Sequence, residues 1–356
     1  MNDLSSPLQA TETRACSCTI DSLEPPDWRA YLDSRPDATV FHDARWVKVM
    51  GEAYANPGYF ITARRHGKIV GVLPLVLQRS LLFGCHLCSL PYLDASGLLA
   101  DDADAASSIL AASQELMAQE KASWIELRQY QPLTTPMPQR TDKVTMRLDL
   151  PAGQQALMEQ LRSKTRNQVR KALSLNMAAQ WGHAQLLDDF YLVYTRTMRD
   201  IGSPPHSRQF FQVLIEAFGP QAEIFSIREG DTPVGAALTL SDSRRVYVPW
   251  SGSDWRHGSG QANTMLFWSM LATCCDRRVG SFDFGRSTRD SGTHVFKQKW
   301  GATEVPLYWQ YLLAKGKSMP APPAASTKLH FAGACWRKLP MPLVRFLGPR
   351  IIRKVS

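Results

Sequence analysis

The sequence predicts an α/β fold made of two similar domains, each a mixed, mostly antiparallel twisted sheet flanked by helices. Its 356 residues suit two domains of ordinary size better than one. Hydrophobic residues make up 44% of the chain, which lets each half bury its own core. The same order of predicted elements occurs twice. We therefore expect a first domain over residues 1–150, a second over residues 151–314 and a tail over residues 315–356.

The first half begins with a helical pattern over residues 46–54, where apolar side chains recur at i, i+3 and i+4. Residues 59–64 and 69–77 predict two strands joined by a turn at Gly67. Three further elements follow: a strand over 87–90, a helix over 105–121 and a strand over 124–128.

The second half repeats this order. Its elements are helices over 190–198 and 211–218, a strand–turn–strand over 223–240, a strand over 245–250, a helix over 262–275 and a strand over 281–284. Val70-Gly71 corresponds to Val234-Gly235. The alternative is two unrelated α/β domains that happen to share a similar hairpin.

The positive charge is concentrated in the tail. The chain carries 41 basic and 32 acidic residues, a net charge of +9. Nine of the basic residues and none of the acidic ones follow Ala314, so residues 1–314 are neutral. A neutral body argues against a large nucleic-acid footprint, whereas a basic tail with apolar residues is typical of contact with an anionic membrane.

The tail begins with a linker over residues 319–327, which is rich in Pro, Ala and Ser. Residues 329–355 mix large apolar side chains with arginines, and Pro340, Pro342 and Pro349 prevent one long regular helix. Short amphipathic segments on a membrane are one interpretation. A tail that packs on the body or is disordered is the other.

Seven cysteines, an odd number scattered along a long chain, favour a reducing compartment over a disulfide framework. No signal-peptide pattern occupies residues 1–11, and no apolar segment is long enough to span a bilayer. We expect a cytoplasmic protein. If the tail binds lipid, the protein would be peripheral on the inner face of the membrane. Cys85 and Cys88 lack a second ligand pair for zinc and fit a strand, so no metal is expected.

Four stretches carry a resemblance to a known family. They are GVLPL at 71–75 with SLPY at 89–92, RSKTRNQVRKA at 162–172, MRDIGSPPHSRQFF at 198–211 and FDFGRSTRDSGTHVFKQKWG at 282–301. Over residues 39–313 the chain resembles the Fem-like branch of the GNAT acyltransferase superfamily, in particular FemAB-related members associated with exosortase/PEP-CTERM surface-polysaccharide systems. The resemblance implies tandem GNAT-like domains, in which two parallel strands splay apart and leave unpaired backbone groups for an acyl donor.

The last of these stretches predicts the catalytic site. Lys297 matches the family's Phe-Lys motif, which implies that its ammonium stabilises the oxyanion formed when an amine attacks an acyl carbonyl. The alternative is a surface lysine, because Lys299 would lie on the same side of an extended segment. Asp283, at the end of a strand closed by Gly285, is a candidate general base if burial raises its pKa. Arg286 is predicted either to bind a phosphate or to pair with Asp283.

A second basic group lies on the helix predicted around residues 162–172. Arg166 and Arg170 are four residues apart and share a face. With Lys164, the resemblance implies contact between this face and a phosphorylated acceptor. The alternative is an ordinary solvated helix face.

The donor is expected near the end of the strand over 245–250. Trp250 and Ser251 would contact the acyl group through their backbone, by analogy with the family. A Gly-rich turn with Gly258 and Gly260 precedes a helix and could hold the pyrophosphate of coenzyme A. Trp255 occupies the position where GNAT enzymes usually have Arg or Gln, and Arg256 could compensate. The alternative is a simple capped loop.

The predicted function is therefore an N-acyltransferase. It would transfer an acyl or aminoacyl group to an amine on a small-molecule or lipid-linked precursor of the cell envelope or of an exopolysaccharide. The co-substrate would be acyl-coenzyme A or aminoacyl-tRNA, with no permanently bound cofactor. The first domain, which lacks the Phe-Lys motif, would support the acceptor cleft. The alternatives are a non-catalytic membrane-associated scaffold for polysaccharide assembly and an RNA-binding protein.

Overall fold

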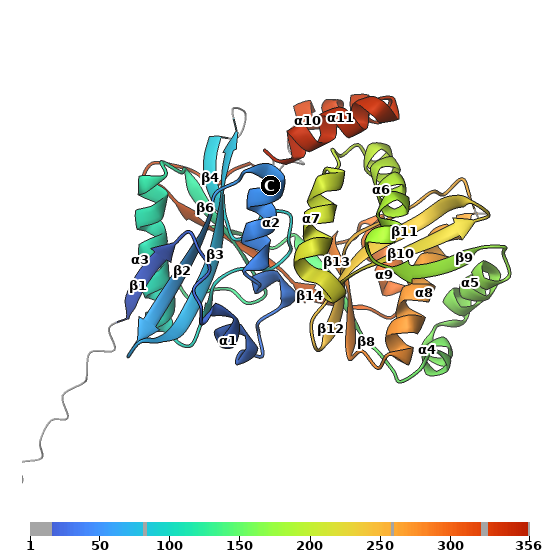
Figure 1. The fold of residues 1–356 in the computed structure, drawn as a ribbon, viewed down its shortest axis with the longest axis horizontal. Coiled ribbons are helices and arrows are strands. Elements are labelled where there is room, and N and C mark those ends of the chain that lie inside the picture. Colours follow the sequence, from blue (N-terminus) through green and yellow to red (C-terminus); the bar gives the residue numbers. More distant parts are fainter. Residues whose placement is uncertain (1–15, 81–83, 258–259, 322–326, 355–356) are drawn as a thin grey trace, which may run out of the picture.

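Two twisted sheets lie side by side and are flanked by helices (Figure 1). The computed structural model describes residues 16–80, 84–257, 260–321 and 327–354. Each sheet combines antiparallel pairs with one parallel pair, β4 with β6 (Gly84–Cys88 and Trp124–Gln129) in the first and β12 with β13 (Arg245–Ser253 and Ser281–Thr288) in the second. The predicted α/β class is confirmed.

The first sheet has the strand order β1-β2-β3-β4-β6-β15-β7, and β5 pairs with β3 beside this path. Its remaining strands are β1 (Ser17–Asp21), β2 (Gly58–Arg65), β3 (Lys68–Ser80), β5 (Leu99–Ala100), β7 (Gln139–Arg140) and β15 (Tyr308–Leu313).

The second sheet has the order β14-β8-β13-β12-β11-β10-β9. Its remaining strands are β8 (Lys143–Asp149), β9 (Ala178–Gly182), β10 (Ala222–Glu229), β11 (Thr232–Ser241) and β14 (Thr303–Pro306).

The helices cover both faces of each sheet. They are α1 (Trp28–Asp33), α2 (Arg45–Tyr54), α3 (Ala103–Gln119), α4 (Gln154–Gln160), α5 (Ser163–Leu173), α6 (Leu187–Ile201), α7 (Arg208–Phe218), α8 (Ala262–Asp276), α9 (Gly292–Gln298), α10 (Thr327–Trp336) and α11 (Met341–Ile352), with short 3-10 turns at Val40–His42, Ala184–Leu186 and Gly219–Gln221. All the helices predicted from apolar periodicity are present. Side-chain caps fix several starts, as where the Asp102 carboxylate accepts the Ala105 N–H of α3.

The internal repeat extends to single residues. In β2–β3 the register shifts so that Val70 has no partner, and in β10–β11 the same happens at Val234. The carbonyls of both valines then accept a backbone N–H from a later loop, at 2.8 Å from Asp101 and 2.7 Å from Asp254. A shared bulge at corresponding positions supports duplication over two unrelated domains that happen to share a similar hairpin.

The two domains share a hydrophobic core. Helix α2 of the first half packs against α7 of the second, between the two sheets (Figure 1). Trp46 lies against Phe218 with ring centroids 4.9 Å apart, and Trp250 joins the same cluster. The outer faces of the two sheets have separate cores, under α3 and α8 respectively. The interface is therefore as apolar as a domain interior, which favours a rigid pair.

Sheet membership differs from the predicted domain limits in two strands. The strand β8 lies within the predicted first domain but pairs with β13 in the second sheet. The strand β15 lies within the predicted second domain but pairs with β6 in the first sheet. The chain thus crosses between the sheets twice, because local patterns specify that a segment is extended and not which sheet it joins.

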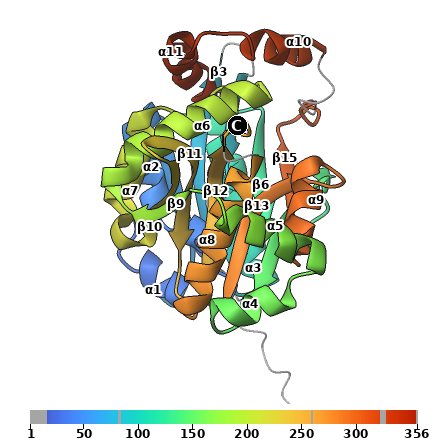
Figure 2. The same cartoon turned by 90° about the vertical axis from the view of Figure 1, so that its right-hand side faces the viewer.

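The tail folds onto the body. Helices α10 and α11 lie across one end of the molecule, beside α6 (Figures 1 and 2). Val344 and Gly348 form the buried face of α11, and Gly348 lies so close to Pro205 that a Cβ would be 2.4 Å from its Cδ. The Tyr92 hydroxyl of the first domain donates to the Ile352 carbonyl at 2.9 Å. Helix α11 therefore packs on the body, which was one of the two interpretations of the tail.

Within the described residues, no helix is both long enough and apolar enough to cross a bilayer.

Candidate active site

The parallel strands of the second sheet splay apart. The pairing of β12 with β13 covers only residues 245–247 against 281–283. Beyond this point β12 continues along β11 as far as Ser253, while β13 continues along β8. The facing edges from Val248 and Phe284 onward therefore have no strand partner among the described residues. We call this opening the β12–β13 gap.

A bulge in β13 shapes one edge of the gap. Gly285 has φ +76°, and a Cβ on it would lie 2.7 Å from the Val248 carbonyl oxygen, so only glycine fits. The register against β8 shifts between Asp283 and Arg286. The strand was predicted to end at Gly285, but it runs on to Thr288 because the bulge lets pairing resume.

Lys297 fills the space behind this bulge. Its ammonium donates to the carbonyls of Gly285 at 2.7 Å and Arg286 at 2.9 Å. The side chain is 7% exposed, and burial lowers the pKa of Lys297 to about 8. An ammonium has three N–H groups, and two are used here, so one remains for a substrate oxygen as far as the described residues show.

Lys297 lies on a helix and not on the extended segment that was expected. The Ser291 hydroxyl accepts the His294 N–H and starts α9, which runs to Gln298. Lys299 is the exposed residue after this helix, so it does not share a side with Lys297. The alternative of a surface lysine at position 297 does not agree with its burial.

Asp283 is fully engaged by its neighbours. Its carboxylate accepts hydrogen bonds from the Thr145 hydroxyl, from Arg147 Nε at 3.0 Å and from the Gly285 N–H at 2.9 Å. These contacts fix β13 to β8 and hold the bulge in shape. The geometry favours this bracing role over the general base expected from the sequence.

Arg286 pairs with the first domain and not with Asp283. The Asp94 carboxylate accepts the Arg286 backbone N–H at 3.0 Å and lies 3.5 Å from its guanidinium. Sequence reasoning missed Asp94, although it follows the SLPY motif by two residues. The first domain therefore contributes a carboxylate at the edge of the β12–β13 gap.

The equivalent gap of the first sheet is closed by its own chain. Strands β4 and β6 pair only over Leu87–Cys88 against Ile125–Glu126, then separate. Ser96 enters the space, donating its hydroxyl to the Ser89 carbonyl and its N–H to the Arg128 carbonyl at 3.1 Å. Gly97 follows, where a Cβ would lie 2.7 Å from that same carbonyl oxygen. Ser96 and Gly97 therefore occupy the position that a donor would need in this gap.

A buried ion pair and two aromatic side chains lie between the gap of the first sheet and Arg286. Arg128 is 1% exposed, with its Nε 2.7 Å from the Glu126 carboxylate. The Tyr311 hydroxyl donates to the same carboxylate at 2.9 Å. The Trp309 ring contacts the guanidiniums of both Arg128 and Arg286, at 4.3 and 5.0 Å from its centroid. Both aromatic residues come from β15, the strand that returns from the second domain.

The predicted donor residues differ in their surroundings. The Trp250 side chain packs in the shared core against Phe210 and Phe211, so only its backbone borders the gap. Ser251 is half-buried on the same strand. Gly260 has φ +73° and precedes α8. Gly258 lies outside the described residues.

Arg256 is tied to carboxylates. Its guanidinium lies 3.0 Å from Asp254 and 3.3 Å from Asp200, and it stacks over the exposed Trp255 ring. A phosphate that used Arg256 would have to compete with these two carboxylates.

The predicted acceptor residues are not brought together. Helix α5 lies on the side of the second domain away from the first (Figure 1), whereas Arg286 faces the first domain. Lys164 and Arg170 are exposed on α5. Arg166 donates to the carbonyls of Glu159 and Leu161, at 3.1 and 2.9 Å, and so closes the end of α4. The structure supports a structural role for Arg166 and separates Arg286 from the other three.

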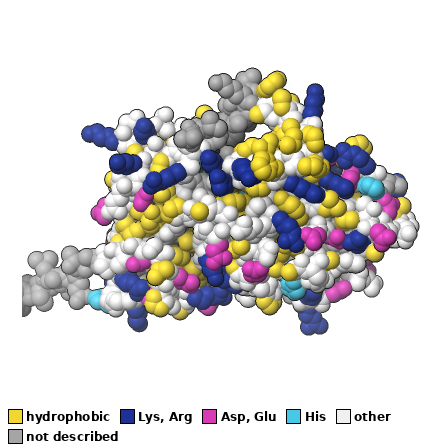
Figure 3. All heavy atoms as spheres, turned by 45° about the horizontal axis from the view of Figure 1, so that its top comes forward, with side chains coloured by type: hydrophobic (Ala, Val, Ile, Leu, Met, Phe, Trp, Pro, Cys, Tyr) yellow, Lys and Arg dark blue, Asp and Glu magenta, His cyan; other side chains and the backbone are white. Residues whose placement is uncertain are grey.

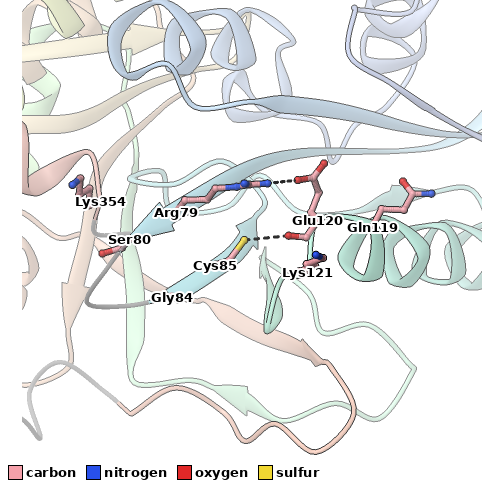
Figure 4. Close-up of a pocket in the computed structure, with 8 residues that line it drawn as sticks. All are labelled: Arg79, Ser80, Gly84, Cys85, Gln119, Glu120, Lys121 and Lys354. Carbon is pink, nitrogen blue, oxygen red and sulfur yellow. Dashed lines mark hydrogen bonds and ion pairs between the residues drawn. The ribbon is translucent and has the colours of Figure 1, made fainter.

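A surface depression of about 510 Å³ lies elsewhere, beside the ends of β3 and β4 (Figure 4). Three of the residues that line it contact one another, with Arg79 2.6 Å from the Glu120 carboxylate and the Cys85 thiol donating to the Glu120 carbonyl. It contains none of the predicted site residues. Within the described chain, no group of three or more His, Cys, Asp or Glu could hold a metal ion.

The family model of the acetyltransferase (GNAT) domain matches residues 159–298, which include β12, β13 and Lys297. Over these residues the chain is similar to a GNAT acetyltransferase domain. No curated protein matches the chain in sequence.

Solved structures extend the likeness to the whole fold. The crystal structure of FemX has a TM-score of 0.61 at 14% identity, covering 83% of this chain and 97% of FemX. L-PGS from Bacillus licheniformis has a TM-score of 0.56 at 9% identity, with 89% and 98% covered. A tandem GNAT protein from the clavulanic acid biosynthesis pathway has a TM-score of 0.54 at 10% identity, with 85% and 100% covered. The predicted tandem GNAT-like architecture is confirmed.

The contribution of Asp94 can be tested by Asp94→Asn. The variant keeps the size of the side chain but removes the charge opposite Arg286, so we expect kcat/KM for acyl transfer to fall by about ten- to a hundredfold. Asp101→Asn is the matched control, because it removes a carboxylate of the same domain that pairs with Arg35 away from the gap. Equal activity of the two variants would show that Asp94 does not serve the site.

Proposed function

We propose that this chain is an N-acyltransferase whose chemistry takes place in the β12–β13 gap. The observation that carries the proposal is Lys297, a buried ammonium with one N–H left over, set behind unpaired strand edges in a GNAT domain. A donor carbonyl placed in the gap would receive hydrogen bonds from backbone N–H groups of the open strand edge. Lys297 would act at the same carbonyl as negative charge develops on it.

The reaction is nucleophilic acyl substitution. The lone pair of an acceptor amine forms a C–N bond to the donor carbonyl, and the resulting oxyanion takes the free N–H of Lys297 as its partner. When the carbonyl re-forms, the bond to the leaving group breaks, and the proton that the amine gives up passes to the departing sulfur or oxygen. The leaving group is a thiol for acyl-coenzyme A and a ribose hydroxyl for aminoacyl-tRNA.

Acyl-coenzyme A is the donor that we propose first. The loop between β12 and α8 leads from the open end of the gap to the start of a 15-residue helix, where backbone N–H groups attract a pyrophosphate. Aminoacyl-tRNA is the alternative donor, and the neutral charge of residues 1–314 speaks against a large RNA footprint.

The acceptor that we propose is an amine on a small-molecule or lipid-linked precursor of the cell envelope or of an exopolysaccharide. The resemblance of residues 39–313 to the Fem-like branch supports this class of acceptor. We place the protein in the cytoplasm at the inner face of the membrane, because its excess positive charge is concentrated in the tail.

Calorimetric titration of the full chain with acetyl-coenzyme A, free coenzyme A and charged tRNA tests the proposal. We expect acetyl-coenzyme A to bind in the micromolar range, with release of free thiol once an amine acceptor is added. If only charged tRNA binds, the donor is aminoacyl-tRNA in place of acyl-coenzyme A, and acyl transfer to an amine remains the proposed reaction. If no donor binds, the acyltransferase proposal fails and the non-catalytic scaffold for polysaccharide assembly, which needs only the tail, becomes the better explanation.

A further inference from the structure

Several large apolar side chains are exposed at the end of the molecule that carries the tail helices. Phe331 is 72% exposed on α10, and Leu343 and Phe346 point outward from α11. Ile201, at the end of α6, is 61% exposed, and Trp255, just beyond β12, is 69% exposed. Single exposed apolar residues are ordinary, but a group of this size at one end of a chain requires an explanation.

Contacts connect Ile201 with α10 and with the loop that carries Trp255. Gly202, next to Ile201, lies so close to α10 that a Cβ on it would be 2.9 Å from the Gly333 carbonyl. Asp200, on the other side of Ile201, is 3.3 Å from Arg256, which stacks over Trp255. The two neighbours of Ile201 in the sequence therefore contact α10 on one side and the loop after β12 on the other. We call Ile201, Trp255, Phe331, Leu343 and Phe346 the apolar end surface.

The charge along the tail part of this surface has one sign, whereas the part beside Trp255 also contains Asp200, Asp254 and Glu229. The exposed basic residues of α10, α11 and the segments that follow them are Arg337, Lys338, Arg345, Arg350 and Arg353. No Asp or Glu follows Ala314, and the nearby Asp200 and Asp254 are paired with arginines. Figure 3 shows hydrophobic and basic side chains together on this face. Along the tail helices, apolar side chains interspersed with cations complement an anionic bilayer, whose headgroups accept the charge while the interface accepts the rings.

The apolar end surface also adjoins the site from both sides. Trp255 follows β12 by two residues, so it lies at the open end of the β12–β13 gap. Tyr92, which donates to the last turn of α11, precedes Asp94 by two residues in the loop that reaches the gap. A membrane that contacts the surface would therefore face the site.

We propose that the apolar end surface, including Ile201 and Trp255 of the catalytic domain, docks on an anionic lipid bilayer and turns the open end of the gap toward it. This inference rests on the proposed function and deepens it, because an acceptor amine would then be presented from the membrane. It also differs from the earlier tail hypothesis, in which residues 315–356 alone make the contact.

Co-sedimentation of the full chain with vesicles tests the proposal without any turnover. The vesicles are phosphatidylcholine with about one third phosphatidylglycerol, and phosphatidylcholine alone is the reference. We expect binding to the anionic vesicles only, and about a tenfold or greater weakening by Leu343→Glu and by Ile201→Glu or Trp255→Glu. Leu23→Glu is the matched control, because Leu23 is 79% exposed and precedes α1, at the opposite end of the molecule (Figure 1).

The possible outcomes distinguish docking by the whole surface from docking by the tail alone and from no docking. If Leu343→Glu weakens binding while Ile201→Glu and Trp255→Glu do not, the tail binds alone and the proposed orientation of the gap is wrong. If the unmodified chain does not sediment with anionic vesicles, membrane docking is wrong altogether, whereas donor binding measured by titration remains a separate test of the acyltransferase. Deletion of residues 316–356 is the weaker experiment, because it would also uncover Pro205 and Tyr92.

Discussion

Replacing Lys297 with methionine should lower kcat/KM for acyl transfer by about a hundred- to a thousandfold, the usual cost of losing one oxyanion donor. Methionine fills most of the buried space but offers no N–H to the substrate or to the carbonyls of Gly285 and Arg286. The measurement is steady-state turnover with the donor found by titration. Lys299→Met is the matched control, since it removes an exposed cation two residues away. Unchanged turnover in Lys297→Met would disprove the site assignment.

The stability of the Lys297 variant should distinguish a functional from a structural role. Burial lowers the pKa of Lys297 to about 8 from 10.5, so the folded state disfavours the charged form. Between these two values the unfolded chain binds more protons, and the stability of the native protein should rise with pH. Lys297→Met removes this dependence, and below pH 8 the relief of burying a charge offsets the loss of its two hydrogen bonds, so the melting temperature should stay close to that of the native protein. A variant that is inactive because it is misfolded would instead melt at a lower temperature.

The same pKa predicts how activity depends on pH. If the charged form of Lys297 stabilises the oxyanion, kcat should fall as pH rises through about 8, where the ammonium loses its proton. Lys297→Arg keeps the charge at all accessible pH values, so any activity it retains should lack this decline. A decline of unchanged position in Lys297→Arg would assign the titration to another group, such as the acceptor.

Replacing Glu126 with glutamine should lower the free energy of unfolding by about 3–5 kcal/mol, because it leaves the buried guanidinium of Arg128 without its counter-charge. The carboxylate also accepts the Tyr311 hydroxyl from β15, so the loss would loosen the strand that returns from the second domain. Chemical denaturation monitored by tryptophan fluorescence measures the change. Glu52→Gln is the matched control, because Glu52 forms only an exposed i,i+4 pair with Lys48 and should change stability by less than about 1 kcal/mol.

A double variant separates the lost pair from the buried charge. Arg128→Met in the Glu126→Gln background removes the uncompensated cation, so part of the stability should return. Burial tends to raise the pKa of Glu126, but the charge and hydrogen bonds of Arg128 and the Tyr311 hydroxyl lower it below its usual value. The stabilisation that ionised Glu126 provides is therefore fully present above the pKa that this carboxyl has in the unfolded chain. It is lost as pH falls through the lower pKa of Glu126 in the folded protein. Additive losses in the double variant would contradict the pairing.

The sequence by itself determined the elements and their duplication. Apolar side chains at helical spacing located α2, α6 and α7, and the paired glycines Gly71 and Gly235 marked two hairpins that share the same bulge. These patterns predicted the observed elements correctly because each depends only on residues a few positions apart in the sequence. The resemblance in residues 282–301 also pointed to Lys297, which is buried beside the gap.

Only the tertiary structure decided what surrounds Lys297. Asp94 accepts the Arg286 N–H across a sequence separation of 192 residues. Asp283 accepts hydrogen bonds from Thr145 and Arg147, which lie within the limits predicted for the other domain. The exchange of β8 and β15 between sheets, the loop that closes the first gap and the packing of α11 are likewise non-local. No local pattern records such contacts, because the free energy that selects them comes from burial and charge pairing between segments that meet only in the folded chain.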